Sequence, residues 1–171
     1  MVDFNNTDFF IEQIDINVKN TVDTQIKNRY IGFIAVTAIT GYETAVRQII
    51  TDFAKSNHEI LWNYVTSHLE RLNAGISEEA IQERYLKRFG RKYSEAFKSN
   101  IQVANNGVMK TERNSNPSAA YRNLIQWRNQ FVHTGIIPNT PTFEEAIKAY
   151  SLGKYIIVAL EETLKPRDAV P

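Results

Sequence analysis

The sequence predicts an all-α protein, and three observations lead to this conclusion. Apolar residues recur with a helical period in several segments, and residues that begin and end helices flank those segments. Glycine and proline are scarce, at 7 and 5 of 171 residues, which argues against a loop-rich all-β protein. We therefore expect a bundle of about five to seven helices, forming one domain over residues 1–171.

Three helices are expected in the first half of the chain. The longest is predicted from Thr24 to Phe53, because its apolar residues keep a period of about 3.6 throughout. Its β-branched part, 31–39, would suit a strand alone, but the helical period continues beyond it. Gly32 and Gly41 each weaken this helix by roughly 1 kcal/mol relative to alanine, yet they permit close packing. Shorter helices are predicted over residues 8–19 and 58–72.

Start and stop signals divide the next part of the chain. Ser77 precedes two glutamates, which predicts a helix that reaches about Phe89. Gly90 is expected to break or bend this helix before a further helical piece over residues 91–103. Residues 105–116 are polar and lack a period, so we predict a loop there.

Two more helices complete the prediction. The Asn-Pro pair at 116–117 supplies a cap and a first helical residue, and Gly135 is a typical helix end. Thr142 and Glu145 form a T-x-x-E capping box that opens the last helix, which Pro166 is expected to end.

The composition excludes several classes of protein. With no cysteine, the chain has no disulfide framework, no thiol nucleophile and no cysteine-based zinc site. Glycine-rich phosphate loops, G-x-S-x-G and H-E-x-x-H are also absent, so we expect neither a cofactor nor a metal. The net charge of +1 points to no particular partner, so any nucleic-acid surface must be a local patch.

The sequence also carries no sign of membrane insertion. The N-terminal residues lack the basic and then apolar regions of a signal peptide. The longest apolar run, 31–39, is too short to span a bilayer. We expect a soluble cytoplasmic protein.

The most informative segment is 121–135, which reads YRNLIQWRNQFVHTG. On a helical wheel, Arg128 falls in the middle of an apolar stripe. The stripe consists of Tyr121, Leu124, Ile125, Phe131 and Val132. A polar shoulder adjoins it and consists of Arg122, Gln126, Asn129 and His133.

Arg128 therefore needs a partner, because a buried guanidinium cannot shed its charge. A carboxylate, a second subunit and a phosphate all suit its planar fork. His133 lies in the last helical turn, where the helix dipole favours a protonated ring. From spacing alone, a structural ion pair and a helix-terminal histidine are the favoured explanation of the two residues.

The sequence RNQFVH at 128–133 resembles the R-N-x-x-x-H motif of the HEPN superfamily, and Gly135 follows it as it often does there. The upstream segment 86–97, LKRFGRKYSEAF, also resembles the helix that precedes this motif. The resemblance implies a HEPN-like helical bundle that forms a homodimer, with both motifs facing one cleft. It also implies a metal-independent endoribonuclease, acting as a toxin with a cognate antitoxin protein or as a phage-defence effector.

The same resemblance implies a mechanism in which RNA supplies its own nucleophile, the 2′-hydroxyl. His133 would serve as general base or acid, since imidazoles titrate near neutral pH. Arg128 would clamp the phosphate and stabilise the transition state, and Asn129 would orient His133 or a phosphate oxygen. The expected products carry a 2′,3′-cyclic phosphate and a 5′-hydroxyl, and DNA should not be cut.

Other charged residues are candidates for supporting roles. Glu43 would pair with Arg128 or polarise His133, or it is a solvated surface carboxylate. Arg122 would add a phosphate contact, or it is an ordinary surface arginine. Basic residues in 84–98 and in the predicted loop would bind the RNA backbone, although those of 84–98 also suit a solvated helix face. They are Arg84, Lys87, Arg88, Arg91, Lys92, Lys110 and Arg113.

Two other functions compete with the nuclease. The first is a non-catalytic helical module that binds RNA, a nucleotide or a protein partner through the same cleft. The second is a structural subunit in which Arg128 seals a dimer. The intact R-N-x-x-x-H motif favours the nuclease, whereas the near-neutral net charge favours the binding module.

Overall fold

The chain folds into a bundle of helices, and the prediction of an all-α protein is confirmed. The computed structural model describes residues 2–21, 23–69, 75–137 and 141–165, and all regular secondary structure in these ranges is helical. The elements are α1 (Asn5–Lys19), α2 (Thr24–Asn57), α3 (Glu59–Leu69), α4 (Glu78–Ala80), the π-helix η1 (Ile81–Leu86), α5 (Lys87–Phe89), α6 (Arg91–Thr111), α7 (Pro117–Thr134) and α8 (Phe143–Leu164). Because α4, η1 and α5 are continuous, the described residues form seven helices.

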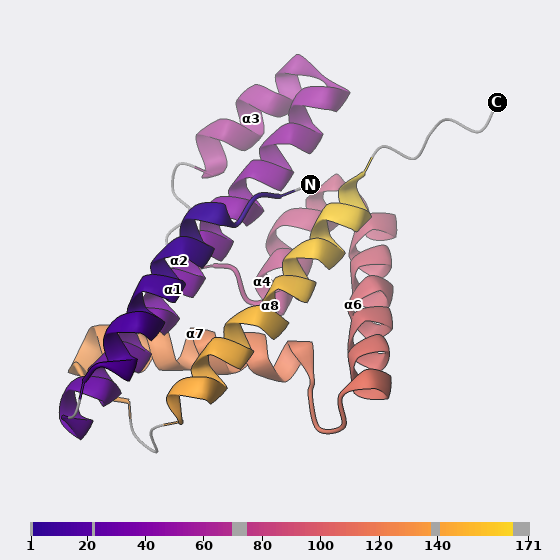
Figure 1. Cartoon of the computed structure of the whole chain (residues 1–171). Coiled ribbons are helices and arrows are strands. Elements are labelled where there is room, and N and C mark those ends of the chain that lie inside the picture. The colour runs from indigo at the N-terminus through magenta and orange to yellow at the C-terminus, as the bar shows by residue number, and fades with distance from the viewer. Residues whose placement is uncertain (1, 22, 70–74, 138–140, 166–171) are drawn as a thin grey trace.

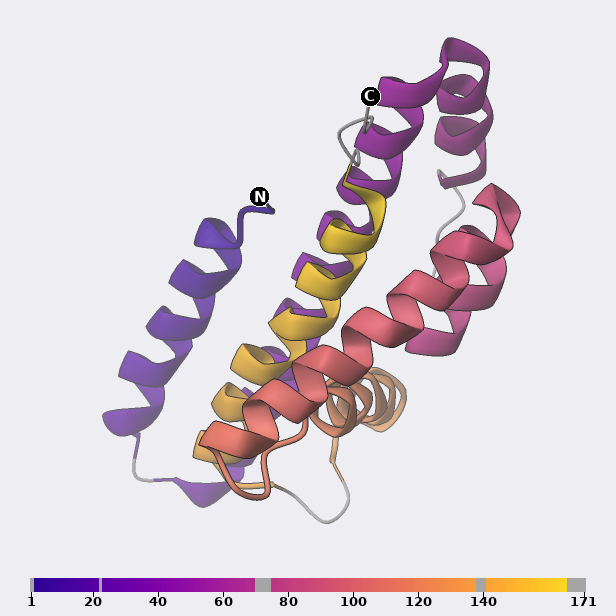
Figure 2. The same ribbon diagram turned by 90° about the vertical axis from the view of Figure 1, so that its right-hand side faces the viewer.

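Two long helices, α2 and α8, form the centre of the bundle. Helix α8 packs against α2, α6 and α7, while α2 also contacts α1, α3 and α7. Helix α7 runs across the lower parts of α2 and α8 (Figure 1). In Figure 2, α1 lies on one side of the central pair, and α3 with the η1 segment lies on the other. The core between these helices includes the fully buried Ile156, Ile157 and Leu160 of α8.

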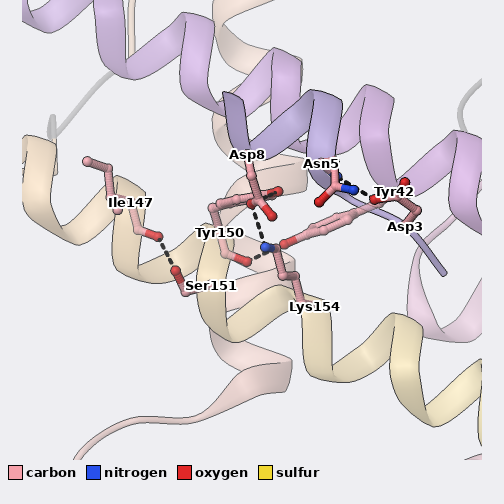
Figure 3. Close-up of polar contacts among 8 residues, drawn as sticks. All are labelled: Asp3, Asn5, Asp8, Tyr42, Ile147, Tyr150, Ser151 and Lys154. Atoms are coloured by element: carbon pink, nitrogen blue, oxygen red, sulfur yellow. Dashed lines mark hydrogen bonds and ion pairs between the residues drawn. The ribbon is translucent and has the colours of Figure 1, made fainter. Parts of the chain in front are cut away.

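A polar cluster attaches α1 to α8 (Figure 3). The Tyr150 hydroxyl and the Lys154 ammonium both donate to Asp8 Oδ1, at 2.7 and 2.5 Å. The buried Tyr42 hydroxyl donates to the carbonyl oxygen of Tyr150. The Tyr42 ring stacks on Tyr150 and on Tyr121, with centroids 5.8 and 5.5 Å away. This stack of three tyrosines joins α8, α2 and α7.

The first helices extend a little beyond their predicted ends. Helix α1 begins at Asn5, three residues before the predicted start, and α2 continues four residues past Phe53 to Asn57. The predicted end of the third helix near Leu72 lies outside the described residues. Asp23 caps α2, because its Oδ1 accepts from the backbone N–H groups of Gln25 and Ile26.

The predicted loop at 105–116 is wrong for its first seven residues, because α6 continues to Thr111. Val108 follows Ile101 by two helical turns, and both side chains are buried on the same face. The polar Asn105 is satisfied on the helix surface: its amide donates to Ser118 Oγ at 2.9 Å and accepts from the Ser118 N–H at 3.1 Å. Contacts with α7 thus override a weak local pattern.

The remaining start and stop signals are confirmed. Ser77 Oγ accepts from the backbone N–H of Ala80 at 3.1 Å, and the helix break lies at Gly90. Asn116 Oδ1 accepts from the N–H of Ala119 at 2.8 Å, with Pro at the first turn of α7. The capping box of α8 is complete, with both reciprocal hydrogen bonds formed. Pro166 lies outside the described residues.

A search for membrane spans finds none among the described helices, since none is both long and apolar enough to cross a bilayer.

Candidate active site

The first half of α7 anchors the segment that carries the candidate residues. Tyr121 and Leu124 are buried, with exposed fractions of 1% and 0%. The Tyr121 hydroxyl donates to the carbonyl oxygen of Ile76 at 2.6 Å. Burial raises the pKa of Tyr121 well above its usual value, so the hydroxyl keeps the proton that it donates. This half of the helix therefore has a fixed position relative to α2 and the segment before α4.

The second half of α7 passes very close to α2 at Gly32. A Cβ atom built on Gly32 would lie 2.2 Å from the ring of Phe131, which is far inside van der Waals contact. The Phe131 ring also packs edge-on against Phe33, with centroids 5.3 Å apart. The expectation that Gly32 permits close packing is thus met, and the partner is the helix turn between Arg128 and His133.

Arg128 is half-buried beside this contact, and its Nη1 donates to Asn129 Oδ1 at 3.1 Å. Among the described residues, no carboxylate lies within 4.0 Å of the guanidinium. Asn129 therefore orients the arginine, and most of the guanidinium donors remain available for a ligand. The structure pairs Asn129 with Arg128 and places no hydrogen bond between Asn129 and His133.

His133 lies in the last turn of α7, where its side chain is exposed. Gly135 ends the helix in the left-handed conformation, with φ 71°, and its N–H donates to the carbonyl of Phe131 at 2.8 Å. Five residues separate His133 from Arg128, which corresponds to a rise of about 7.5 Å along the axis. The same spacing turns the two side chains about 140° apart around the helix, so they do not stack directly on each other.

Glu43 of α2 lies beside this site. Burial raises the pKa of the Glu43 carboxyl, although the charges of Arg128 and Arg47 oppose the shift. The carboxylate thus experiences the Arg128 charge without forming an ion pair within 4.0 Å. Glu43 is thus half-buried near Arg128 and is not a fully solvated carboxylate, and its roles toward Arg128 and His133 stay predictions.

Arg47 was not among the predicted site residues, although its spacing from Glu43 could have indicated that it lies near the site. Arg47 follows Glu43 by four residues on α2, so the two side chains lie on one helix face. Together with Arg128, it brings two positive charges to one half-buried carboxylate. This end of the site is therefore positively charged, as an anionic ligand requires.

The predicted polar shoulder of α7 is found in the structure, whereas the predicted apolar stripe is incomplete. All four shoulder residues are exposed, including Arg122. Val132 was expected in the stripe but is 55% exposed, because α7 has passed beyond the core at this point. An apolar surface, consisting of Phe33, Val132 and Ile136, consequently borders His133.

The structure brings together only part of the predicted RNA-binding set. The basic residues of η1, α5 and the start of α6 lie within one stretch and are exposed, and they are Arg84, Lys87, Arg88, Arg91 and Lys92. Lys110 lies in the last turn of α6 rather than in a loop, roughly 28 Å along the axis from Arg91. Arg113 follows just beyond it, four residues before the start of α7 and therefore toward the end of this helix opposite to His133.

Two of these basic residues are engaged with neighbouring carboxylates. Lys87 pairs with Glu83 at 2.7 Å, and Arg91 pairs with Glu95 at 2.6 Å. Arg84 and Arg88 have no carboxylate within 4.0 Å among the described residues. Within the described ranges, no group of three or more His, Asp or Glu side chains is arranged to hold a metal ion.

Comparison with protein-family models gives a match to the family described as RiboL-PSP-HEPN over residues 7–166, which is most of the chain. Comparison with curated proteins and with solved structures gives no match.

Proposed function

Because this chain belongs to the RiboL-PSP-HEPN family, we propose that it is a metal-independent endoribonuclease. One observation carries the proposal: the R-N-x-x-x-H motif occupies the solvent-facing end of a helix whose other end is fixed in the core. Its Arg128 is oriented by Asn129, and its His133 is exposed to a substrate.

In the proposed reaction, His133 removes the proton of a ribose 2′-hydroxyl, and the resulting oxygen attacks the adjacent phosphorus. Arg128 binds the non-bridging phosphate oxygens and stabilises the charge that develops on them. The bond from phosphorus to the 5′-oxygen breaks and this oxygen takes a proton from water, so the products carry a 2′,3′-cyclic phosphate and a 5′-hydroxyl. Glu43 lies within electrostatic range of Arg128, and Arg122 offers a further phosphate contact on the exposed shoulder.

We further propose that the active form is a homodimer. The apolar surface of Phe33, Val132 and Ile136 lies next to His133, and its members are 49%, 55% and 68% exposed. Burial of this surface against a second copy would bring two motifs to one cleft. The biological setting that we propose is a toxin held by a cognate antitoxin protein, or a phage-defence effector.

The deciding experiment is cleavage of total RNA and of tRNA by purified protein in EDTA. His133→Ala and Arg128→Ala should each reduce the rate by at least about 100-fold, since each removes a group that acts in the transition state. Lys55→Ala is a matched control, because it removes an exposed positive charge about 35 Å along α2 from Gly32, which contacts the motif. DNA and RNA with a 2′-deoxy nucleotide at the cut site should stay intact.

The outcome also separates the nuclease from the binding module. Equal cleavage by wild type and by both motif variants would reject the proposed site. RNA binding without cleavage by the wild type, lost in Arg128→Ala, would establish the non-catalytic module instead. In cells, growth arrest on expression of the wild type but not of His133→Ala would support the toxin proposal.

A further inference from the structure

A second concave site lies between α3 and the helix that contains η1. Its cavity volume is about 160 Å³, and Val65, Leu69 and Phe89 contribute apolar walls. Val65 and Leu69 are themselves buried, with exposed fractions of 4% and 3%. An apolar cavity of about 150 Å³ is large enough to accept benzene. The space therefore fits a single aromatic ring.

The rim of this cavity is positively charged. Arg84 and Arg88 line the opening, and neither has a carboxylate within 4.0 Å among the described residues. Their neighbours Lys87 and Arg91 are by contrast paired with glutamates. Arg84 and Arg88, which have no carboxylate partner among the described residues, thus flank an apolar cavity. This arrangement favours an aromatic ring that carries phosphates on either side.

The local backbone beside the cavity departs from α-helical geometry. Residues Ile81–Leu86 form a π-helix, in which each turn contains one residue more than in an α-helix. Such segments are rare and occur frequently at functional sites. Here the segment and the turn after it present Arg84, Tyr85 and Arg88 toward α3.

The cavity and the motif lie on the same side of α2. Glu43 is within electrostatic range of Arg128 and also of Tyr85, whose ring lines the cavity. Ile50, at the cavity floor, is seven residues beyond Glu43, a rise of about 10 Å along α2. A strand whose phosphate contacts Arg128 can therefore reach the cavity with a base several nucleotides away.

We propose that this cavity binds one unpaired base of the RNA substrate, with Arg84 and Arg88 on the phosphates that flank it. The inference rests on the proposed function and deepens it by a second contact: one extruded base held at a distance from the cut. Stacking against Tyr85 and Phe89 tolerates any base, so the cavity selects an unpaired nucleotide rather than a sequence.

The test measures binding of a short labelled single-stranded RNA to the full-length His133→Ala protein in EDTA, by fluorescence anisotropy. One abasic nucleotide is moved along the strand, position by position. We expect one position to weaken binding about 10-fold. Val65→Phe, which fills the cavity, should weaken binding of intact RNA by a similar factor and remove the dependence on that position.

Arg88→Ala provides a second test that does not alter the core, because its side chain is exposed. It should weaken binding and reduce its salt dependence. Lys148→Ala is the matched control, since it removes the same charge from an exposed side chain that pairs with Glu112 outside the cavity. In this control, an abasic nucleotide at the sensitive position should weaken binding as much as it does in the parent protein.

Several results would overturn the inference. They are the absence of any sensitive abasic position, or equal behaviour of Arg88→Ala and Lys148→Ala. A change of oligomeric mass in Val65→Phe with unchanged RNA binding would assign the cavity to a protein contact instead. If wild type still cleaves RNA, these results reject the base site alone, whereas no RNA binding by any variant rejects both proposals.

Discussion

The two halves of α7 differ in what their side chains contact. In the first half, Tyr121 and Leu124 enter the core together with Ala120. In the second half, from Ile125 to Thr134, every described side chain is half-buried or exposed. The motif therefore contributes little to the stability of the bundle, whereas the buried first half of α7 fixes the position of the whole helix. Stability and activity should therefore respond to different substitutions along one helix.

Leu124→Ala should produce the largest change in stability. Leu124 has an exposed fraction of 0%, so its truncation leaves a cavity between α7 and the central helices. We expect a loss of about 2–5 kcal/mol in the free energy of unfolding, measured by urea denaturation. The cleavage rate per folded molecule should stay close to that of the wild type.

His133→Ala should have the opposite effect, with a loss of activity and little change in stability. The side chain is exposed, so stability should change by less than about 0.5 kcal/mol while the proposed cleavage disappears. A Leu124→Ala protein that remains folded but has lost its activity would show that the two halves are coupled. The proposed division of the helix would then be wrong.

Val132→Asp tests whether the exposed half forms a subunit contact. Val132 is 55% exposed in one copy, so a charge there should alter the free energy of unfolding of the monomer by less than about 0.5 kcal/mol. In the proposed homodimer, the same charge would be buried next to a second copy and would oppose association. We expect a dimer for wild type and a monomer for the variant by light scattering.

Ser151→Asp on α8 is a suitable control, because Ser151 is exposed on a different helix and receives the same charge. An unchanged mass for Val132→Asp, with wild type dimeric, would place the subunit contact elsewhere. A monomeric wild type that cleaves RNA would remove the dimer from the proposed mechanism.

Sequence patterns were sufficient to predict how most helices begin and end. Caps and helix ends depend on residues close in sequence, so Asn116, Gly135 and the capping box at Thr142 were predictable. The polar shoulder of α7 was also predictable, because a helical wheel uses only residues that are close in sequence. Val132 was misplaced in the apolar stripe, because a wheel shows the direction of a side chain but not where the neighbouring helices end.

The remaining differences come from tertiary contacts. Residues 105–111 lack an apolar period, and only the hydrogen bonds between Asn105 and Ser118 and the burial of Val108 explain why α6 continues. The π-helix at η1 and the cavity beside it also had no sequence signal. Glu43 was a candidate from its place on α2, but the effect of burial on its pKa required the folded structure.

Glu43→Gln should have the smallest effect, and its sign is informative. Glu43 faces the polar half of α7 through Arg128, whereas its neighbour Tyr42 stacks on Tyr121 in the core half. Burial raises the pKa of Glu43 in the folded protein above its usual value of 4.5. The folded state therefore binds the proton more tightly than the unfolded chain, and this contribution to stability is lost as the pH rises through the folded pKa.

Glutamine stays neutral, so Glu43→Gln should gain stability relative to wild type between acidic and neutral pH, as measured by urea denaturation at each pH. Glu12→Gln reports the effect of net charge alone, since Glu12 is exposed on α1. The opposite sign, a variant that loses stability at neutral pH, would mean that attraction to Arg128 and Arg47 outweighs burial. The polar half of α7 would then be held by an ion pair as well as by the core.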